Sequence, residues 1–267
     1  MTEEKQQKVQ ELIRDVCVHP CDFYRAHWGA VERFEDLPFM DVEKIIATPF
    51  SARSYTTEKG LAKIVRTHRV PFLVQWSLRD LKAERFGDTT CKRPLVLLSD
   101  SHDALEKSLW FYEHDILPLI GETNNLQAAS FAADAYAIDA LVADSKTVLP
   151  FLAEYEKGHD VKTISVTLIE NRFDPAMVAR LQISCARVLS VLACSETGAF
   201  GVACPEQGDG EVCFHPNDES IVEIENGELV VTRLALLRTP IIRYRTGIRA
   251  EAVSADCSCR EVAFTLT

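Results

Sequence analysis

Apolar residues along the first two thirds of the chain follow two alternating spacings, which predict helices and strands in turn. Residues 3–17 place Val9, Leu12, Ile13 and Val16 on one helical stripe, with charged residues opposite. Runs rich in β-branched and aromatic residues predict strands, at 71–76, 95–98, 161–169 and 188–193. Between these runs the spacing returns to that of helices, at 41–46, 103–117, 148–155 and 175–181.

Local signals refine several of these elements. The helix over 103–117 is expected to bury the stripe Leu105, Leu109, Tyr112 and Ile116. Ser145 is expected to cap the helix over 148–155, and Asp174 the helix that begins at Pro175. Within the small, apolar segment 128–143, we expect a buried strand and its flanks, which hold Phe131, Tyr136 and Ile138.

The pattern changes after residue 200, where the helical spacing disappears. Residues 221–224, 228–232 and the segment from Pro240 onward predict strands, and Asn226-Gly227 predicts a type I′ hairpin turn. The fold class is therefore α/β, a mainly parallel sheet flanked by helices and followed by a β-rich C-terminal portion. We expect a large domain over residues 1–200 and a β-rich subdomain over 201–267.

Charge and composition narrow the function. The 267-residue chain has a formal net charge of -11 with 47% hydrophobic and 26% charged residues. Such acidity argues against nucleic acid or an anionic membrane as a partner. The polar N-terminus shows no signal peptide, and no apolar run is long enough to span a membrane. Nine cysteines without a secretory signal predict reduced thiols and a cytoplasmic protein.

Cysteines and a histidine gather near the C-terminus as candidate metal ligands. They are Cys204, Cys213, His215, Cys257 and Cys259. Zinc prefers thiolate and imidazole ligands in a tetrahedron, so we expect a structural zinc site in this region. Five candidates exceed the four positions, and Cys213 competes with Cys204 for one of them. The alternative is a set of ordinary thiols with an exposed histidine.

Two further segments carry weaker signals. Cys17, His19 and Cys21 lie within five residues, but Pro20 interrupts them, and ordinary buried thiols are the better interpretation. The loop Gly87–Pro94 holds Thr89, Thr90 and Lys92 before a strand, which is a composition that can bind phosphate. Its single glycine favours a polar surface loop as the alternative.

Short motifs over the last part of the chain resemble the adenylate-forming superfamily. Leu192-Ala-Cys-Ser-Glu196 is similar to the family's Tyr-Gly-x-Ser/Thr-Glu motif. Pro240-Ile-Ile-Arg-Tyr-Arg-Thr-Gly247 is similar to its Pro-x-Ile-Arg-Tyr-Arg-Thr-Gly-Asp motif, and Cys257-Ser-Cys-Arg260 to its Cys-x-Cys-Gly-Arg motif. Within the superfamily, the chain most resembles the phenylacetate–CoA ligase type and the related coenzyme F390 synthetases.

The resemblance implies activation of a carboxylic acid by ATP to an acyl-adenylate, which then passes its acyl group to a thiol. It implies that Glu196 holds magnesium and that Ser195 donates to phosphate. Further nucleotide contacts are implied for Thr89, Thr90, Lys92, Arg243 and Arg245. The resemblance implies zinc ligands at Cys204, His215, Cys257 and Cys259. For the two arginines, the alternative is ion pairing with the many acidic residues.

Several positions depart from the family pattern. Ile248 stands where an aspartate would bind the ribose, Leu192 where an aromatic ring would stack on adenine, and Cys91 replaces a loop glycine. From the resemblance we expect this chain to lack the family's small C-terminal domain, with its catalytic lysine. Three hypotheses follow. The chain is a truncated ligase, impaired or dependent on a protein partner or homo-oligomer, or it is a non-catalytic zinc-stabilised binding or regulatory module. The third hypothesis is an unrelated α/β protein with a C-terminal zinc hairpin.

Overall fold

A computed structural model describes most of the chain. The described residues are 3–53, 60–66, 71–77, 80–81, 84, 86, 90–204, 206, 212–235, 238–254, 257, 259 and 262–267. Two compact units are made of segments that are distant in sequence. One contains Met1–Arg85, Cys194–Gly201 and His215–Thr267, and the other contains Phe86–Ala193 and Val202–Phe214. Within the described residues, no helix combines the length and apolarity needed to cross a membrane.

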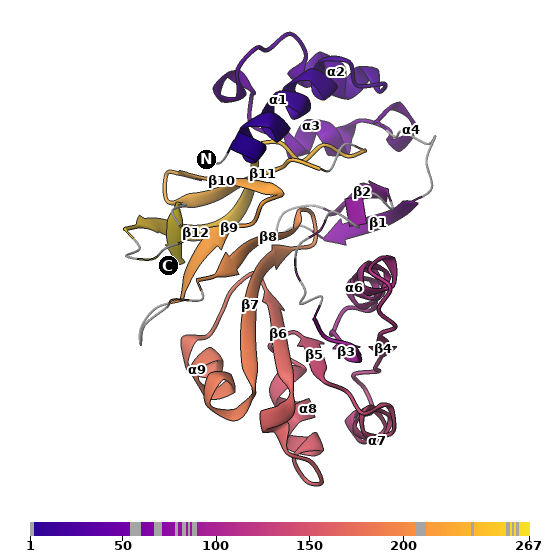
Figure 1. Cartoon of the computed structure of the whole chain (residues 1–267). Helices are drawn as coiled ribbons and strands as arrows, with labels where there is room; N and C mark the ends of the chain where they lie inside the picture. The colour runs from indigo at the N-terminus through magenta and orange to yellow at the C-terminus, as the bar shows by residue number, and fades with distance from the viewer. Residues whose placement is uncertain are drawn as a thin grey trace. The chain divides into compact units, whose positions relative to one another are not determined.

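The unit built around Phe86–Ala193 is an α/β layer structure (Figure 1). Its parallel strands are β3 (Pro94–Leu97), β4 (Leu119–Ile120), β5 (Ala140–Ala143), β6 (Ser165–Glu170) and β7 (Arg187–Cys194). Its helices are α6 (Ser101–Glu113), α7 (Leu126–Tyr136), α8 (Val148–Tyr155), α9 (Pro175–Ser184) and the 3-10 helix η2 (Val161–Thr163). This alternation confirms the predicted mainly parallel sheet.

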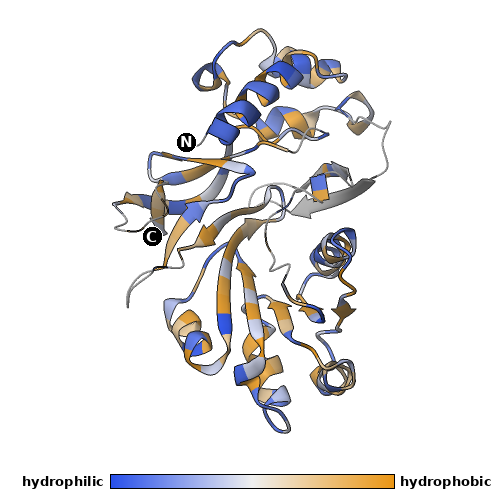
Figure 2. Cartoon of the chain, viewed as in Figure 1, coloured by the Kyte–Doolittle hydropathy of each residue, from blue (hydrophilic) through white to orange (hydrophobic). Residues whose placement is uncertain are grey.

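Strands β3 and β5 of this unit are apolar along their whole length because both faces are covered. All four residues of β3 and of β5 are buried. Figure 2 shows the hydrophobic colour along these strands and mixed colours on the helices. Burial on both faces explains why the strands read as continuous apolar runs in the sequence rather than as alternating ones.

The segment 128–143 differs from the prediction of a buried strand. Residues Leu126–Tyr136 form α7, and only Ala140–Ala143 form a strand. Alanine is the strongest helix former, and Asn125 caps this alanine-rich helix by accepting from the Ala128 amide at 3.1 Å. Phe131 therefore lies on the exposed side, with 76% of its surface accessible.

The predicted buried stripe of α6 is also wrong. Leu105 and Tyr112 are exposed, whereas Lys107, Ser108 and Phe111 are buried together with Trp110. Phe86 explains this choice, because its ring centroid lies 4.6 Å from that of Trp110 and 5.9 Å from that of Phe111. Two large aromatic rings outweigh the smaller aliphatic side chains in selecting the buried face.

Helix caps in this unit follow the sequence in one case and depart from it in another. Asp174 caps α9 by accepting from the Ala176 amide, with Pro175 at the first position, as predicted. Ser145 does not cap α8, whose N-cap residue is Thr147. The carboxylate of Asp144 accepts from the amides of Lys146 and Thr147 and so satisfies the donors at this end.

The other unit combines N-terminal helices with the C-terminal strands. Its helical elements are α1 (Glu3–Cys17), α2 (Asp22–Trp28), η1 (Phe34–Asp36), α3 (Val42–Ala47) and α4 (Phe50–Arg53). A separate hairpin pairs β1 (Gly60–Arg66) with β2 (Pro71–Ser77). The remaining strands are β8 (Gly198–Ala203), β9 (Cys213–Pro216), β10 (Ser220–Glu225), β11 (Glu228–Arg233), β12 (Tyr244–Val253) and β13 (Ala263–Leu266). The sheet has eleven strands in the order β10-β11-β12-β13-β9-β8-β7-β6-β5-β3-β4.

The C-terminal strands confirm the predicted β-rich portion. Asn226 and Gly227 both have positive φ, 55° and 71°, as a type I′ turn between β10 and β11 requires. The strand expected from Pro240 onward begins later, at Tyr244. Pro240 to Arg243 form a turn and its exit instead, and Arg243 has a φ of 48°.

Gly198 begins β8 at a point of close approach. Its φ is +67°, and a Cβ there would lie 2.5 Å from Glu84 Oε1 and 2.6 Å from the Trp76 ring. The same Glu84 oxygen accepts from the amide of Ala199 at 2.8 Å. Only glycine satisfies both the backbone conformation and the lack of space at this position.

Candidate metal cluster and candidate nucleotide site

Four predicted metal ligands come together from three segments of the chain. Cys204 follows β8, His215 lies on β9, and Cys257 and Cys259 lie between β12 and β13. Their ligand atoms all lie within 4.8 Å of one another. The amide of Cys204 donates to the carbonyl of Cys213 at 2.8 Å, which joins the end of β8 to the start of β9.

The geometry of this metal cluster fits a tetrahedral ion. Bonds of about 2.3 Å to sulfur and about 2.0 Å to nitrogen put the two ligand atoms about 3.5 Å apart on a tetrahedron. Cys257 Sγ and His215 Nε2 lie 3.4 Å apart. Three thiolates and one imidazole form a donor set that binds zinc in preference to magnesium or calcium.

Cys213, the fifth candidate, is not part of the cluster. It precedes His215 by two residues on β9, so the alternation of a strand suggested that both side chains could share a face. Its place in the structure is instead that of the backbone partner of Cys204. The structure thus groups Cys204 with His215, Cys257 and Cys259.

The N-terminal Cys17, His19 and Cys21 do not converge on a common point. His19 Nδ1 accepts from the amide of Cys21 at 3.0 Å. The thiol of Cys21 donates to the Ala52 carbonyl at 3.0 Å, and that of Cys17 to the Val31 carbonyl at 3.7 Å. These contacts are those of ordinary structural side chains, the alternative that the sequence favoured.

The turn Ser195–Thr197 joins β7 to β8 and carries the candidate catalytic residues. Glu196 is buried, and the Tyr244 hydroxyl on β12 donates to its Oε1 at 3.1 Å. Ser195 is half-buried on the same turn. Beside them, Cys194 Sγ lies 3.0 Å from Thr197 Oγ1. The turn therefore holds a carboxylate, two hydroxyls and a thiol in a partly enclosed place.

Two neighbours of Glu196 stay protonated at neutral pH. Burial raises the pKa of Cys194 to about 12, and the Glu196 carboxylate adds to the effect. Burial likewise raises the pKa of Tyr244, and the same carboxylate again adds to it. Cys194 is thus unsuited to act as a nucleophile, because the thiolate is the reactive form. Tyr244 remains a donor that holds Glu196.

The predicted phosphate loop is only partly within the described residues, and Thr89 lies outside them. Thr90 and Lys92 are exposed. The amides of Lys92 and Arg93 donate to the two carboxylate oxygens of Asp139, each at 2.9 Å. Two of the loop amides that could have bound an anion are therefore used by an acidic side chain of the protein itself.

Arg243 and Arg245 lie beside Phe39. The guanidinium of Arg243 donates to both carboxylate oxygens of Glu223 at 3.1 Å and to the Leu37 carbonyl at 2.9 Å. Arg245 donates to Glu228 at 3.4 Å. The two guanidinium carbons lie 4.2 and 4.6 Å from the Phe39 ring centroid. These contacts match the ion-pairing alternative for both arginines.

The structure describes the surroundings of Leu192 and Ile248, two positions that depart from the family motifs. Leu192 is buried, so its side chain offers no open face to a purine ring. Ile248 follows Gly247, whose amide donates to Glu228 Oε1 at 2.8 Å. The amide of Ile248 itself donates to Thr246 Oγ1 at 3.1 Å. Glu228 therefore bonds to the backbone next to Ile248, the position where the family has its aspartate.

Sequence reasoning did not identify Asp139, Glu223 and Tyr244, which decide how the candidate residues are held. Asp139 precedes a buried strand and Glu223 alternates within β10, so each carried only the pattern of a solvated acid. Tyr244 lay inside the motif around Arg243, but its partner Glu196 is 48 residues away. No spacing signal in the sequence could have joined these pairs.

Solved structures with a similar fold include two enzymes named as coenzyme A ligase or synthetase and one named as an amide bond synthetase. An open conformation of 2-hydroxyisobutyryl-CoA ligase, in complex with 2-HIB-AMP and CoA, aligns over 98% of this chain and 67% of its own, with a TM-score of 0.69 and 12% identity. O-succinylbenzoate coenzyme A synthetase from Bacillus subtilis, in complex with ATP and magnesium ion, aligns over 77% of this chain and 49% of its own (TM-score 0.55, 11% identity). The amide bond synthetase McbA from Marinactinospora thermotolerans covers 77% and 48% (TM-score 0.57, 14% identity).

These likenesses show that the chain shares its fold with these three proteins. Identity between 11% and 14% does not extend to a subfamily or to an activity. The chain spans two thirds of the first ligase and about half of the other two proteins. No protein-family model and no curated protein matches the sequence.

Proposed function

We propose that the protein binds an adenylate or adenine nucleotide at the Ser195–Thr197 turn and descends from ligases of the phenylacetate–CoA type. The observation that carries the proposal is the buried Glu196, held by Tyr244, on a fold shared with adenylate-forming ligases over 98% of the chain. A buried carboxylate whose described partners are neutral donors is well placed to bind a cation that accompanies phosphate.

Each proposed residue has a distinct part. Glu196 would hold magnesium, and the Ser195 hydroxyl would donate to a phosphate oxygen. Thr90 and Lys92 would contribute charge and a hydroxyl from the loop, with Thr89 as their neighbour. The metal cluster would hold zinc and stabilise the C-terminal strands, since four protein ligands leave no position for substrate. Zinc therefore has no chemical step in this proposal.

The implied reaction is attack of a carboxylate oxygen on the α-phosphorus of ATP, with release of pyrophosphate and formation of an acyl-adenylate. Transfer of the acyl group to a thiol then releases AMP. The proposal includes impairment of this reaction, or dependence on a partner. Arg243 is bonded to Glu223, the loop amides are bonded to Asp139, and Ile248 provides no side-chain acceptor for ribose.

The second candidate function is a non-catalytic binding or regulatory module on the same fold. The bonds of Asp139 and Arg243 favour it, because they stabilise the protein with groups that catalysis would need free. A stable fold with a structural metal and a modified pocket could bind a carboxylic acid or another protein. The two functions differ in whether pyrophosphate is ever released.

Calorimetric titration of the metal-replete protein with ATP and magnesium tests the first proposal. We expect binding that requires magnesium and that Glu196→Gln weakens by more than ten-fold. Glu251→Gln makes the same charge change at an exposed position of β12 and should leave the affinity unchanged. Equal affinities of all three proteins would refute the role of Glu196. Exchange of labelled pyrophosphate into ATP, screened over carboxylic acids, then separates the two candidate functions.

A further inference from the structure

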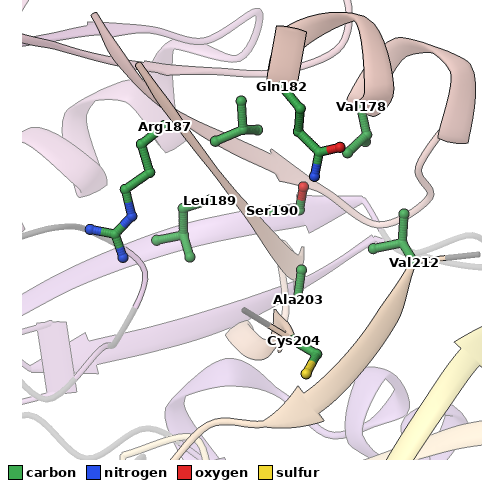
Figure 3. A pocket seen from close by; sticks show the side chains of 9 residues that line it. Val178, Gln182, Arg187, Leu189, Ser190, Ala203, Cys204 and Val212 are labelled. Carbon is green, nitrogen blue, oxygen red and sulfur yellow. The ribbon is translucent and has the colours of Figure 1, made fainter. Parts of the chain in front are cut away.

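A cavity separate from the Ser195–Thr197 turn lies between α9 and β7 (Figure 3). Its volume is about 210 Å³. It is lined by Val178, Gln182, Arg187, Val188, Leu189, Ser190, Ala203, Cys204 and Val212. The sequence pattern gave no sign of it, because its walls come from four separate segments.

Side-chain periodicity explains how the cavity forms. Val178 and Gln182 are four residues apart on α9, so they share one face of the helix. Val188 and Ser190 are two residues apart on β7 and share one face of the strand. Ser190 and Ala203 are too small to fill the space that a leucine or phenylalanine would occupy between these faces. The small residues leave room instead of packing.

Ser190 is the strongest sign of a ligand. The residue is only 2% exposed, and it lines the cavity. Figure 3 shows this hydroxyl and the amide of Gln182 pointing toward one another across the space. A hydroxyl that lines a cavity can bond to a molecule bound there, which replaces the water that would otherwise satisfy it.

We infer that this cavity binds a small uncharged molecule with an amide head and an aliphatic tail. The Gln182 amide can both donate to and accept from another amide, and Ser190 adds a third hydrogen bond. Val178 and Val212 offer apolar contact to the tail. Arg187, the cationic side chain of the lining, extends away from Gln182 and Ser190 in Figure 3. An ionic head would therefore lose hydration without gaining a countercharge.

The volume sets the size of the ligand. Each water takes about 30 Å³ in the liquid, so the cavity holds about seven waters or a molecule of about seven to ten non-hydrogen atoms. Pentanamide has a head and tail of this size. A probe this small binds with a dissociation constant on the order of 1 mM when its contacts are efficient.

Saturation-transfer NMR with pentanamide on the whole, metal-replete chain tests the inference. We expect saturable binding, and we expect the charged isostere pentanoate to bind at least ten-fold more weakly. Gln182→Met keeps the length of an exposed side chain but removes its amide, so it should weaken binding at least ten-fold without loss of fold. Ser190→Ala should weaken it several-fold.

Two control variants distinguish binding in this cavity from binding elsewhere on the protein. Ile183 is 81% exposed on the same helix, so Ile183→Ala should leave pentanamide binding unchanged. Glu196→Gln should leave it unchanged too, which makes the result independent of the proposed nucleotide site. Absence of saturable binding, equal binding of pentanoate, or full binding by Gln182→Met would each overturn the inference.

Discussion

Two regions of this chain combine cysteine with histidine, and they differ in how the side chains meet. Cys17, His19 and Cys21 are neighbours in sequence, yet each bonds to the backbone near it. Cys204, His215, Cys257 and Cys259 span 56 residues, yet their ligand atoms lie within 4.8 Å of one another. Closeness in sequence therefore did not decide which set could hold a metal.

The difference has a physical basis in the chain that carries each set. The N-terminal residues bridge the end of α1 and the start of α2, where the backbone turns each side chain toward its own surroundings. The C-terminal residues lie at or between strand ends, and sheet pairing brings those ends together. A tetrahedral site needs ligands that approach from several directions, which separate segments supply more readily than one short loop.

Removal of a cluster ligand should have the largest effect. Cys259→Ser leaves three ligands, so we expect loss of stoichiometric metal and a fall in Tm of about 10 °C or more, as expected for a loss of several kcal/mol. Cys21→Ser is the matched control, because a serine hydroxyl can still donate to the Ala52 carbonyl. Metal analysis and calorimetry measure both variants. Equal losses of metal and equal falls in Tm would contradict a metal site confined to the C-terminal set.

Metal removal from the unmutated protein should distinguish the two regions by the reactivity of their thiols. Bound thiolates are shielded from alkylation, so a chelator should increase the labelling of Cys204, Cys257 and Cys259 several-fold. Labelling of Cys17 should change far less. Mass spectrometry of alkylated peptides gives the extent at each residue. A uniform increase over all nine cysteines would indicate global unfolding in place of local release.

Cys194 adds a third situation, a thiol that is buried without metal. Burial raises its pKa to about 12 from an ordinary value near 9. Between these values the folded state holds a proton that the unfolded state has lost, so this group's contribution to stability falls as pH rises from about 9 to about 12. Cys194→Ala should flatten the loss of Tm over the accessible part of that range. An unchanged slope would contradict the raised pKa.

The smallest effect is expected at Cys17. Its thiol is half-buried and makes one long contact to the Val31 carbonyl, 3.7 Å away. Cys17→Ser should change the free energy of unfolding by about 1 kcal/mol or less, with metal content unaffected. Chemical denaturation measures the change. A loss of bound metal in this variant would show that the N-terminal region takes part in coordination after all.

Much of the fold could be predicted from the sequence because the signals for these elements are local. The stripe of α1, the cap and proline of α9, and the Asn226-Gly227 turn each depend on residues a few positions apart. One error arose where a distant partner decides, because Phe86 selected the buried face of α6. The other error was local, because the alanines of α7 and its Asn125 cap favour a helix where we expected a strand, and Phe131 is exposed on that helix.

The contacts of the candidate site were even harder to predict from the sequence than the fold. The motifs suggested which residue types belong together, but the acids that bind them lie far along the chain. Asp139 is 47 residues from Lys92, and Glu223 is 20 residues from Arg243. Only sheet topology places these acids, so the sequence could offer ion pairing as an alternative without naming the partner. The family roles of Glu196 and Ser195 remain a prediction.

The close approach at Gly198 has a consequence for how this protein can diverge. Any side chain at that position would collide with Glu84 and Trp76, so a substitution there is viable only after both have been replaced by smaller residues. Glu84 in turn anchors the amide of Ala199, and its replacement leaves that donor without the carboxylate. Trp76 and Glu84 lie more than a hundred residues before Gly198, yet we expect the three positions to change in a fixed order in related sequences, with the glycine replaced last.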